Sequence, residues 1–398
     1  MRPLPMAFEF PNNLYSQALA RSPVSLRSVF VGGLRDYRIA AVIPAYNEEA
    51  NIARVLRSLP TWLRHIILVE DCGSDKTAEV VEQLANEDPR IILIRHERNQ
   101  GVGGAMVTGF KKALELNAQI VVKLDGDGQM NPDHLSALLR PLFAGEADYA
   151  KGNRFHDFRA LAQMPPLRRA GNMALSFLTK AAVGYWNCFD PCNGFVAIRS
   201  EILAALPLDK IHRSYFFETS MLSRLYLLGA VVKDVPMPAR YAGEHSSLSI
   251  SRVLLEFPPK LAYSFGRRML LKNYIYDFSM ESLYLVAAFL FLAVGISYGG
   301  WNWLAYARLG DAAPTGTVVI PAMLIILGFQ ILLSAIGEDL RSVPREPLCE
   351  GPLVAETPAF SHAAIPSPRS EVAPAYAEVT KPREAMPIVQ GSKLQVQG

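Results

Sequence analysis

Two long apolar stretches near the carboxyl end most constrain what this chain can fold into. Residues 283–307 carry no charged side chain, and neither do residues 318–336. As helices rising about 1.5 Å per residue, each is long enough to cross a hydrocarbon core of about 30 Å. The alternative is a pair of buried core helices, but little surrounding sequence remains to bury them. The stretches therefore predict two transmembrane helices.

The charges beside these stretches predict their orientation. The loop between them holds one arginine and one aspartate, whereas the neighbouring basic residues lie outside the hairpin: Arg267, Arg268, Lys272, Arg341 and Arg345. Basic residues concentrate on the cytoplasmic side of a membrane. We therefore expect a multi-pass protein of the cell (inner) membrane whose large domain and carboxyl-terminal tail are cytoplasmic.

The composition agrees with a chain that is partly soluble and partly in a membrane. Half of the 398 residues are hydrophobic and 19% are charged, whereas about 25% is usual for soluble domains. A net charge of +3 is too balanced for a nucleic-acid-binding surface over the whole chain, so we expect no nucleic-acid partner. The four cysteines are too few for a disulfide framework and lack a second pair at zinc spacing, so we interpret them as reduced thiols.

The region before the apolar stretches predicts an α/β domain. Short β-branched runs alternate with helical patterns, and the runs are residues 39–43, 66–69, 91–94 and 120–122. This alternation predicts parallel strands joined by right-handed crossovers. Ligands of such sheets bind beyond the carboxyl ends of the strands, so we expect the site in the loops that follow these runs.

The patterns divide the chain into five segments. Residues 248–281 mix apolar and basic side chains around Pro258-Pro259 and predict one or two amphipathic juxtamembrane helices, with a solvated linker as the alternative. Residues 339–398 are rich in Pro, Ala, Ser and Glu, which predicts a disordered tail. The expected segments are an N-terminal extension (1–37), an α/β domain (38–247), the juxtamembrane region (248–281), two transmembrane helices (282–338) and the tail (339–398).

Three of the strand-end loops are polar or rich in glycine. The first runs from Pro44 to Glu49, and the second places adjacent carboxylates at Glu70 and Asp71. The alternative for the first loop is that its acidic residues complement the dipole of the following helix, and for the second that Ser74 or Asp75 caps the next helix. The third contains Gly101, Gly103 and Gly104, which permit close approach of the backbone to a ligand and offer N–H groups to an anion.

The fourth loop carries alternate carboxylates, Asp125 and Asp127, separated by glycine. Mg²⁺ or Mn²⁺ takes few protein carboxylates and shares its other positions with diphosphate oxygens and water. A calcium loop or an ordinary turn is the alternative, although the twelve-residue calcium pattern is missing.

Taken in order, four motifs resemble the family 2 glycosyltransferases. They are Pro-Ala-Tyr-Asn-Glu, Glu-Asp-Cys-Gly-Ser-Asp, Asn-x-Gly-x-Gly-Gly-Ala and Asp-Gly-Asp-Gly-Gln, beginning at residues 44, 70, 99 and 125. Within that family the chain resembles the polyprenyl-phosphate sugar transferases, which include dolichol-phosphate mannosyltransferases and two-span bacterial glucosyl carriers. The likeness covers roughly residues 38–340. It implies a GT-A type nucleotide-sugar-binding domain.

The resemblance also implies roles on the donor side. Pro44, Tyr46 and Glu48 match the family's first nucleotide-contacting loop, and Asp71 matches the carboxylate that reads the base. Glu70 replaces an aspartate that is more usual in the family.

For the diphosphate and its cation, the resemblance implies a bound Mg²⁺ or Mn²⁺. Asp125 and Asp127 match the pair that binds metal and diphosphate, and Gln129 matches its usual neighbour.

Further implied residues concern catalysis and the acceptor. Arg154 matches an arginine that contacts phosphate, and Glu218 matches an acidic residue near the acceptor. Arg240, with Gly243 and Ser246, resembles a segment that holds the acceptor or the leaving phosphates. The resemblance thus implies a catalytic set of Asp127, Arg154, Glu218 and Arg240.

The resulting hypothesis is a membrane-anchored inverting glycosyltransferase. It would move one sugar from a UDP- or GDP-linked donor to a polyprenyl or dolichyl phosphate on the cytoplasmic face. An anionic lipid phosphate needs no strong general base, whereas a sugar hydroxyl would need one, and Glu218 or Asp190 would then be the candidate. The alternatives are an enzyme that extends a glycan and a non-catalytic nucleotide-sugar sensor. Membrane lipids are expected partners, and homo-oligomerisation is left open.

Overall fold

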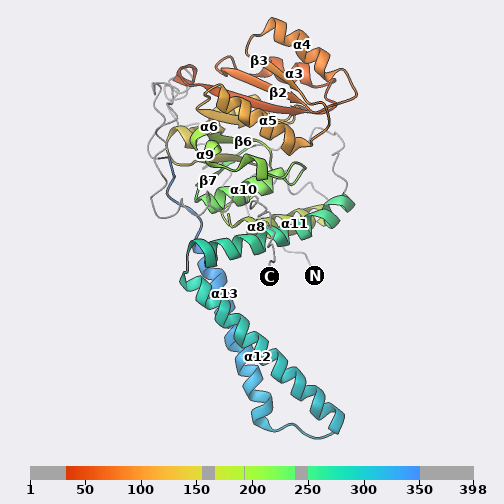
Figure 1. The fold of residues 1–398 in the computed structure, drawn as a ribbon, viewed down its shortest axis with the longest axis vertical. Coiled ribbons are helices and arrows are strands. Elements are labelled where there is room, and N and C mark those ends of the chain that lie inside the picture. Colours follow the sequence, from red (N-terminus) through yellow and green to blue (C-terminus); the bar gives the residue numbers. More distant parts are fainter. Residues whose placement is uncertain (1–32, 155–165, 192, 238–249, 350–398) are drawn as a thin grey trace, which may run out of the picture. The chain divides into compact units, whose positions relative to one another are not determined.

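The computed structural model describes residues 33–154, 166–191, 193–237 and 250–349, with the backbone alone for residues 166–170, 172 and 250–255 (Figure 1). A seven-stranded sheet has the order β3-β2-β1-β4-β6-β5-β7. β6 is antiparallel to β4 and β5, and the other neighbours are parallel. The strands are β1 (Ile39–Ala45), β2 (His65–Glu70), β3 (Ile91–Arg95), β4 (Ile120–Lys123), β5 (Tyr149–Asn153), β6 (Val196–Arg199) and β7 (Val232–Pro236). The prediction of a mostly parallel α/β sheet is confirmed.

Helices alternate with these strands and cover both faces of the sheet. Side chains of β1 alternate between the faces: Ile39, Ala41 and Ile43 join one buried apolar cluster, and Ala40 and Val42 join the other. The helices of this domain are α3 (Ile52–Ser58), α4 (Thr77–Glu87), α5 (Val102–Glu115), α6 (Leu135–Phe143), α8 (Pro166–Val183), α9 (Ser200–Ala205) and α10 (Phe217–Leu228), with short 3-10 turns η1 (Leu34–Asp36), η2 (Pro132–His134) and η4 (Leu208–Lys210).

The juxtamembrane region forms a single helix followed by a π-helical segment. α11 (Ile250–Leu270) continues through Pro258-Pro259 and leads into η5 (Leu271–Tyr276). Its buried residues Phe257 and Leu261 pack with Phe216 and Ala182, which belong to the α/β domain. Figure 1 shows α11 beside α8.

Two long apolar helices follow and pair as a hairpin (Figure 1). α12 (Met280–Leu309) and α13 (Thr315–Arg341) are long and apolar enough to cross a membrane. Only 11% and 17% of their most apolar windows are buried, which contradicts the alternative of two soluble core helices. Length, composition and exposure together indicate a membrane-anchored protein.

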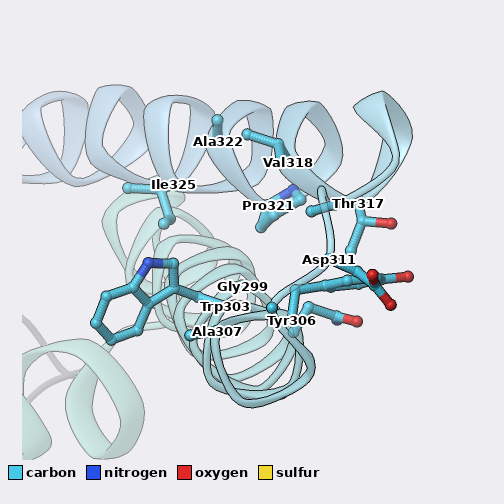
Figure 2. A pocket seen from close by; sticks show the side chains of 13 residues that line it. Gly299, Trp303, Tyr306, Ala307, Asp311, Thr317, Val318, Pro321, Ala322 and Ile325 are labelled. Atoms are coloured by element: carbon cyan, nitrogen blue, oxygen red, sulfur yellow. The ribbon is translucent and has the colours of Figure 1, made fainter.

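An open pocket of about 600 Å³ lies at the loop end of the hairpin. Figure 2 shows Trp303 and Tyr306 of α12, Asp311 of the loop and Pro321 of α13 around it. Trp303 is largely exposed, as is its neighbour Trp301. This exposure agrees with the aromatic residues that line membrane interfaces.

A buried ionic cluster joins the other end of the hairpin to the α/β domain. The Asp339 carboxylate on α13 accepts two hydrogen bonds from Arg268, at 2.6 and 3.0 Å, and one from the Trp186 indole at 2.9 Å. Lys272 lies 3.0 Å from Asp339 and 2.7 Å from Glu281 on α12. Burial would lower the pKa of Lys272, but the hydrogen bond to Glu281 and the nearby carboxylates outweigh it and raise the pKa. The cluster is therefore ionic at neutral pH.

The chain returns to the α/β domain after the hairpin. The fully buried carboxylate of Asp148 accepts hydrogen bonds from the backbone N–H groups of Leu348 and Cys349, at 3.0 and 3.1 Å, and from Val231 at 2.8 Å. The Arg199 guanidinium donates to the Cys349 carbonyl. The expected disorder from residue 339 is therefore wrong for residues 339–349, because a buried carboxylate binds this segment. Residues 350–398 of the tail, and 1–32 of the N-terminal extension, lie outside the described residues.

We predict that Asp339→Ala strongly destabilises the protein, because it leaves the Arg268 charge buried without its carboxylate. The expected loss is about 3–5 kcal/mol. It would be measured as a lower melting temperature of the purified protein in detergent. Glu338→Ala is the matched control, because its ion pair with Arg341 is exposed. Equal melting temperatures for the two variants would contradict this account.

Candidate active site

A cavity of about 890 Å³ lies at the carboxyl ends of β1, β2 and β4. Nine of the predicted site residues line it: Pro44, Tyr46, Glu48, Asp71, Asp125, Asp127, Gln129, Arg154 and Glu218. Glu70 and the candidate base Asp190 are buried and do not line it. Arg240, Gly243 and Ser246 lie outside the described residues. The parallel topology thus brings together side chains that are far apart in the sequence.

The loops after β1 and β2 are bonded to each other. Thr77 accepts a hydrogen bond from the Glu48 N–H at 2.8 Å, and Asn47 accepts one from the Ser74 N–H at 2.8 Å. Asp75 accepts from the Glu49 N–H at 2.9 Å. Desolvation would raise the pKa of Asp75, but its hydrogen bonds, chiefly from Thr77, outweigh it and lower the pKa. These contacts give the β1–β2 edge of the cavity a fixed rim.

Asp71 is buried and already engaged by the chain. Its Oδ1 accepts hydrogen bonds from His96 Nδ1 at 2.7 Å and from the Gln100 N–H at 2.8 Å, and its Oδ2 accepts from the Gly101 N–H at 2.7 Å. The His96 ring is also buried, and its Nε2 lies 2.9 Å from Thr108 Oγ1 on α5. Asp71 therefore positions the glycine-rich loop as well as lining the cavity.

The glycine-rich loop packs against the segment that precedes α10. The N–H groups of Gly103 and Gly104 both donate to the Arg213 carbonyl, at 2.8 and 3.3 Å. A Cβ at Gly103 would lie 2.1 Å from the His212 carbonyl oxygen. The expectation that these N–H groups serve a bound anion is therefore wrong, because the protein's own backbone uses them.

A buried lysine joins the Asp-Gly-Asp loop to α10. Lys123 Nζ lies 2.6 Å from Asp125 Oδ1 and 3.3 Å from Glu218 Oε1, and the lysine side chain is 2% exposed. Burial would lower the pKa of Lys123, but Asp125 and Glu218 outweigh it and raise the pKa. The lysine is therefore charged at neutral pH, and the pairs lose that charge as the pH rises through the elevated pKa.

The Asp125–Asp127 pair fits a hard divalent cation that shares its coordination with a ligand. Both residues line the cavity, the Asp125 side chain is 33% exposed, and the Gln129 N–H orients Asp127 Oδ1 at 2.9 Å. In the described part of the chain, no group of three or more His, Cys, Asp and Glu residues is arranged to hold a metal. Two carboxylates with diphosphate and water as the remaining ligands suit Mg²⁺ or Mn²⁺.

Arg154 is held by Asp190. Its Nε and Nη2 donate to the two oxygens of Asp190, at 2.9 and 3.3 Å, in a bidentate pair. The Asp190 side chain is 2% exposed whereas that of Arg154 is 42% exposed and lines the cavity. Asp190 therefore orients Arg154.

Part of the cavity lining is apolar. Leu175 of α8 and Phe257 of α11 line the cavity and belong to one apolar cluster, which we call the apolar wall. Met237, which follows β7, also lines the cavity but belongs to another cluster. Phe257 is 9% exposed. A carboxylate- and arginine-lined cavity thus has an apolar part formed by α8 and by α11, the helix that leads into the membrane hairpin.

Sequence reasoning missed Lys123, His96 and this apolar wall. The signal for Lys123 was present, because a lysine at the end of the apolar run 120–122 must be paired once it is buried. His96 offered no comparable signal, since its partners Asp71 and Thr108 are separated from it in the sequence.

Comparisons with known proteins identify relatives of this chain. The profile of "Glycosyl transferase family 2" matches residues 40–206. The chain is 36% identical over 186 residues to UDP-N-acetylglucosamine–dolichyl-phosphate N-acetylglucosaminyltransferase of Methanococcus voltae, covering 44% of this chain and 74% of that protein. It is 29% identical over 203 residues to undecaprenyl-phosphate mannosyltransferase of Micrococcus luteus, covering 50% and 82%. Glucosyl-3-phosphoglycerate synthase from Mycobacterium tuberculosis superposes with a TM-score of 0.46 at 20% identity, covering 61% and 83%.

The match to the Methanococcus voltae protein decides the class, because the chain is 36% identical to it and covers 74% of its length. The chain belongs to glycosyl transferase family 2. Its relatives in that family include proteins named as polyprenyl-phosphate sugar transferases.

We predict that Gly103→Ala destabilises the α/β domain, because the added methyl group would collide with the His212 carbonyl. Overpacking of this kind costs about 1–3 kcal/mol, which thermal unfolding would detect. Gly266→Ala on α11 is the control, since nothing lies within 4 Å of its Cβ position. That control should be neutral or slightly stabilising. If Gly103→Ala melts like the control, the close packing is wrong.

Proposed function

We propose that this protein transfers a single sugar from a nucleotide sugar to a polyprenyl or dolichyl phosphate at the cytoplasmic face of the membrane. The transferase domain is assigned to residues 38–247 and its anchor to residues 282–338. The relatives named as dolichyl-phosphate and undecaprenyl-phosphate transferases support this class of reaction.

The observation that carries the proposal is the state of the two carboxylates available as general bases. Glu218 is paired with Lys123, and Asp190 is paired with Arg154. A carboxylate engaged by a cation is poorly placed to take a proton from a hydroxyl group. A lipid phosphate is already anionic and attacks without losing a proton, so this arrangement favours a phosphate acceptor over a sugar hydroxyl.

The cavity offers complementary surfaces for both substrates. Asp125 and Asp127 would hold Mg²⁺ or Mn²⁺, which supplies positive charge to the leaving diphosphate. Arg154, fixed in orientation by Asp190, would contact a phosphate group. The apolar wall of Leu175 and Phe257 faces the same space and suits the first isoprene units of the acceptor.

Direct attack of the lipid phosphate on the anomeric carbon, opposite the leaving diphosphate, inverts the sugar's configuration. The chain residues then have three tasks: they orient the donor, hold the acceptor phosphate and stabilise growing negative charge. Glu218 and Arg240 are assigned to the acceptor side. The relatives differ in the sugar they are named for, so N-acetylglucosamine and mannose are both candidates. Extension of a glycan is the second candidate function, and it would require a free base.

We predict that Asp127→Ala lowers sugar transfer to lipid phosphate at least 100-fold while the protein remains in the membrane, because it removes half of the cation site. Membranes would be incubated with a panel of radiolabelled nucleotide sugars and one polyprenyl phosphate, and labelled lipid extracted. Asp133→Ala is the control, since Asp133 is exposed and does not line the cavity. Full metal-dependent activity in Asp127→Ala would refute the assignment.

For the orientation, we predict that Ala312→Cys in the hairpin loop reacts with a membrane-impermeant thiol reagent added to intact cells. Ala312 is exposed, and it avoids Gly310, whose positive φ of 73° disfavours a side chain. The native exposed Cys72 should react only after permeabilisation. The reverse pattern would place the transferase domain on the outer face.

A further inference from the structure

We propose that the donor carries uridine diphosphate, and that His96 enforces this choice by limiting Asp71 to one open hydrogen-bond position. This inference rests on the proposed function, because it takes the cavity to bind a nucleotide sugar. It concerns the nucleotide base of the donor, whose identity is determined neither by the Asp125–Asp127 pair nor by the apolar wall.

The sheet order fixes where the base would lie. β1 separates β2 from β4, so Asp71 after β2 and Asp125 after β4 lie toward opposite sides of the same cavity. If the diphosphate and its cation occupy the β4 side, the base extends toward β2. There Asp71 lies near Tyr46 and Asn99, which line the cavity with exposed side chains.

The hydrogen bonds of Asp71 leave one acceptor position. A carboxylate has about four lone-pair sites, two on each oxygen. Oδ1 uses both of its sites, for His96 Nδ1 and the Gln100 N–H, and Oδ2 uses one, for the Gly101 N–H. Within the described residues, these are the donors that reach Asp71, so one site on Oδ2 remains for a ligand.

His96 is the positioning residue in this arrangement. An ionised carboxylate only accepts hydrogen bonds, so Nδ1 carries the proton, and Nε2 interacts with Thr108 at 2.9 Å. Because the ring is held from both sides and is 6% exposed, it keeps its donor on Oδ1 and closes that oxygen to a base.

The number of open acceptor positions on Asp71 discriminates between nucleotide bases, because their edges carry different donors. Uracil presents a single N–H between two carbonyl oxygens, so one acceptor satisfies it. Asn99 can donate to a flanking carbonyl, since its Oδ1 already accepts from the Gly101 N–H at 3.0 Å and its NH₂ end remains as donor. Guanine presents two adjacent N–H donors, which occupy both oxygens when a carboxylate binds them side on. Cytosine places an acceptor nitrogen at the centre of its edge, which a carboxylate repels.

The test compares UDP, GDP and CDP by calorimetry with the full chain in detergent and Mg²⁺. Leaving one N–H of guanine unpaired beside the buried Asp71 carboxylate lowers affinity about tenfold or more, so UDP should bind at least ten times more tightly than GDP. Equal or tighter binding of GDP or CDP would overturn the inference but leave the proposed function standing. Binding of none of the three would contradict both.

Two variants isolate the role of His96. In His96→Asn, the new amide places an N–H where Nδ1 stood, so this variant should retain the preference for UDP over GDP. Gln in His96→Gln reaches toward Thr108 instead, which opens a second site on Oδ1 and should narrow the UDP-to-GDP ratio severalfold. A structural role alone would change both affinities together, so an unchanged ratio in His96→Gln would show that His96 does not set the specificity.

Discussion

The buried ammonium group of Lys123 links two segments that line the cavity, the loop after β4 and the start of α10. It lies at the end of the central strand β4 and contacts Asp125 of the following loop and Glu218 of α10. Without this cation the two carboxylates would repel each other in a poorly solvated space. The start of α10 therefore depends on a charge in the sheet. Through the backbone contact of Gly103 with Arg213, so does the packing of the glycine-rich loop.

The local sequence pattern was sufficient to predict the alternating strands and helices from β1 to β4. The runs that became β1–β4 are apolar and β-branched because both faces of a parallel sheet are buried, and the carboxylates at their ends could be predicted to converge. The other strands escaped prediction. β5 contains Lys151, and β7 contains Lys233 and Asp234, so neither has the continuous apolar run that marks a buried strand.

Contacts between distant segments could not be predicted from the sequence. Nothing local shows that Asp190 holds Arg154, or that Asp148 binds residues 348–349 two hundred positions later. The glycine-rich loop illustrates the same limit. Its composition correctly indicated close backbone approach, but only the fold shows that the approaching group is the chain itself. The sequence thus predicted which types of side chain lie at the site. Which residues these side chains contact could be seen only in the tertiary structure.

The return of the chain after α13 has a mechanical consequence. The hairpin is joined to the α/β domain at its base, where Asp339 accepts a hydrogen bond from Trp186 and Arg268 bridges Asp339 to the Ala181 carbonyl. It is joined again after it ends, through the contacts of residues 348–349 with Asp148. A domain attached by one flexible linker can tumble above a bilayer, whereas two separated attachments oppose rotation about either one. These two attachments restrain the candidate active site relative to the hairpin, which suits the proposed transfer from a water-soluble donor to a lipid acceptor.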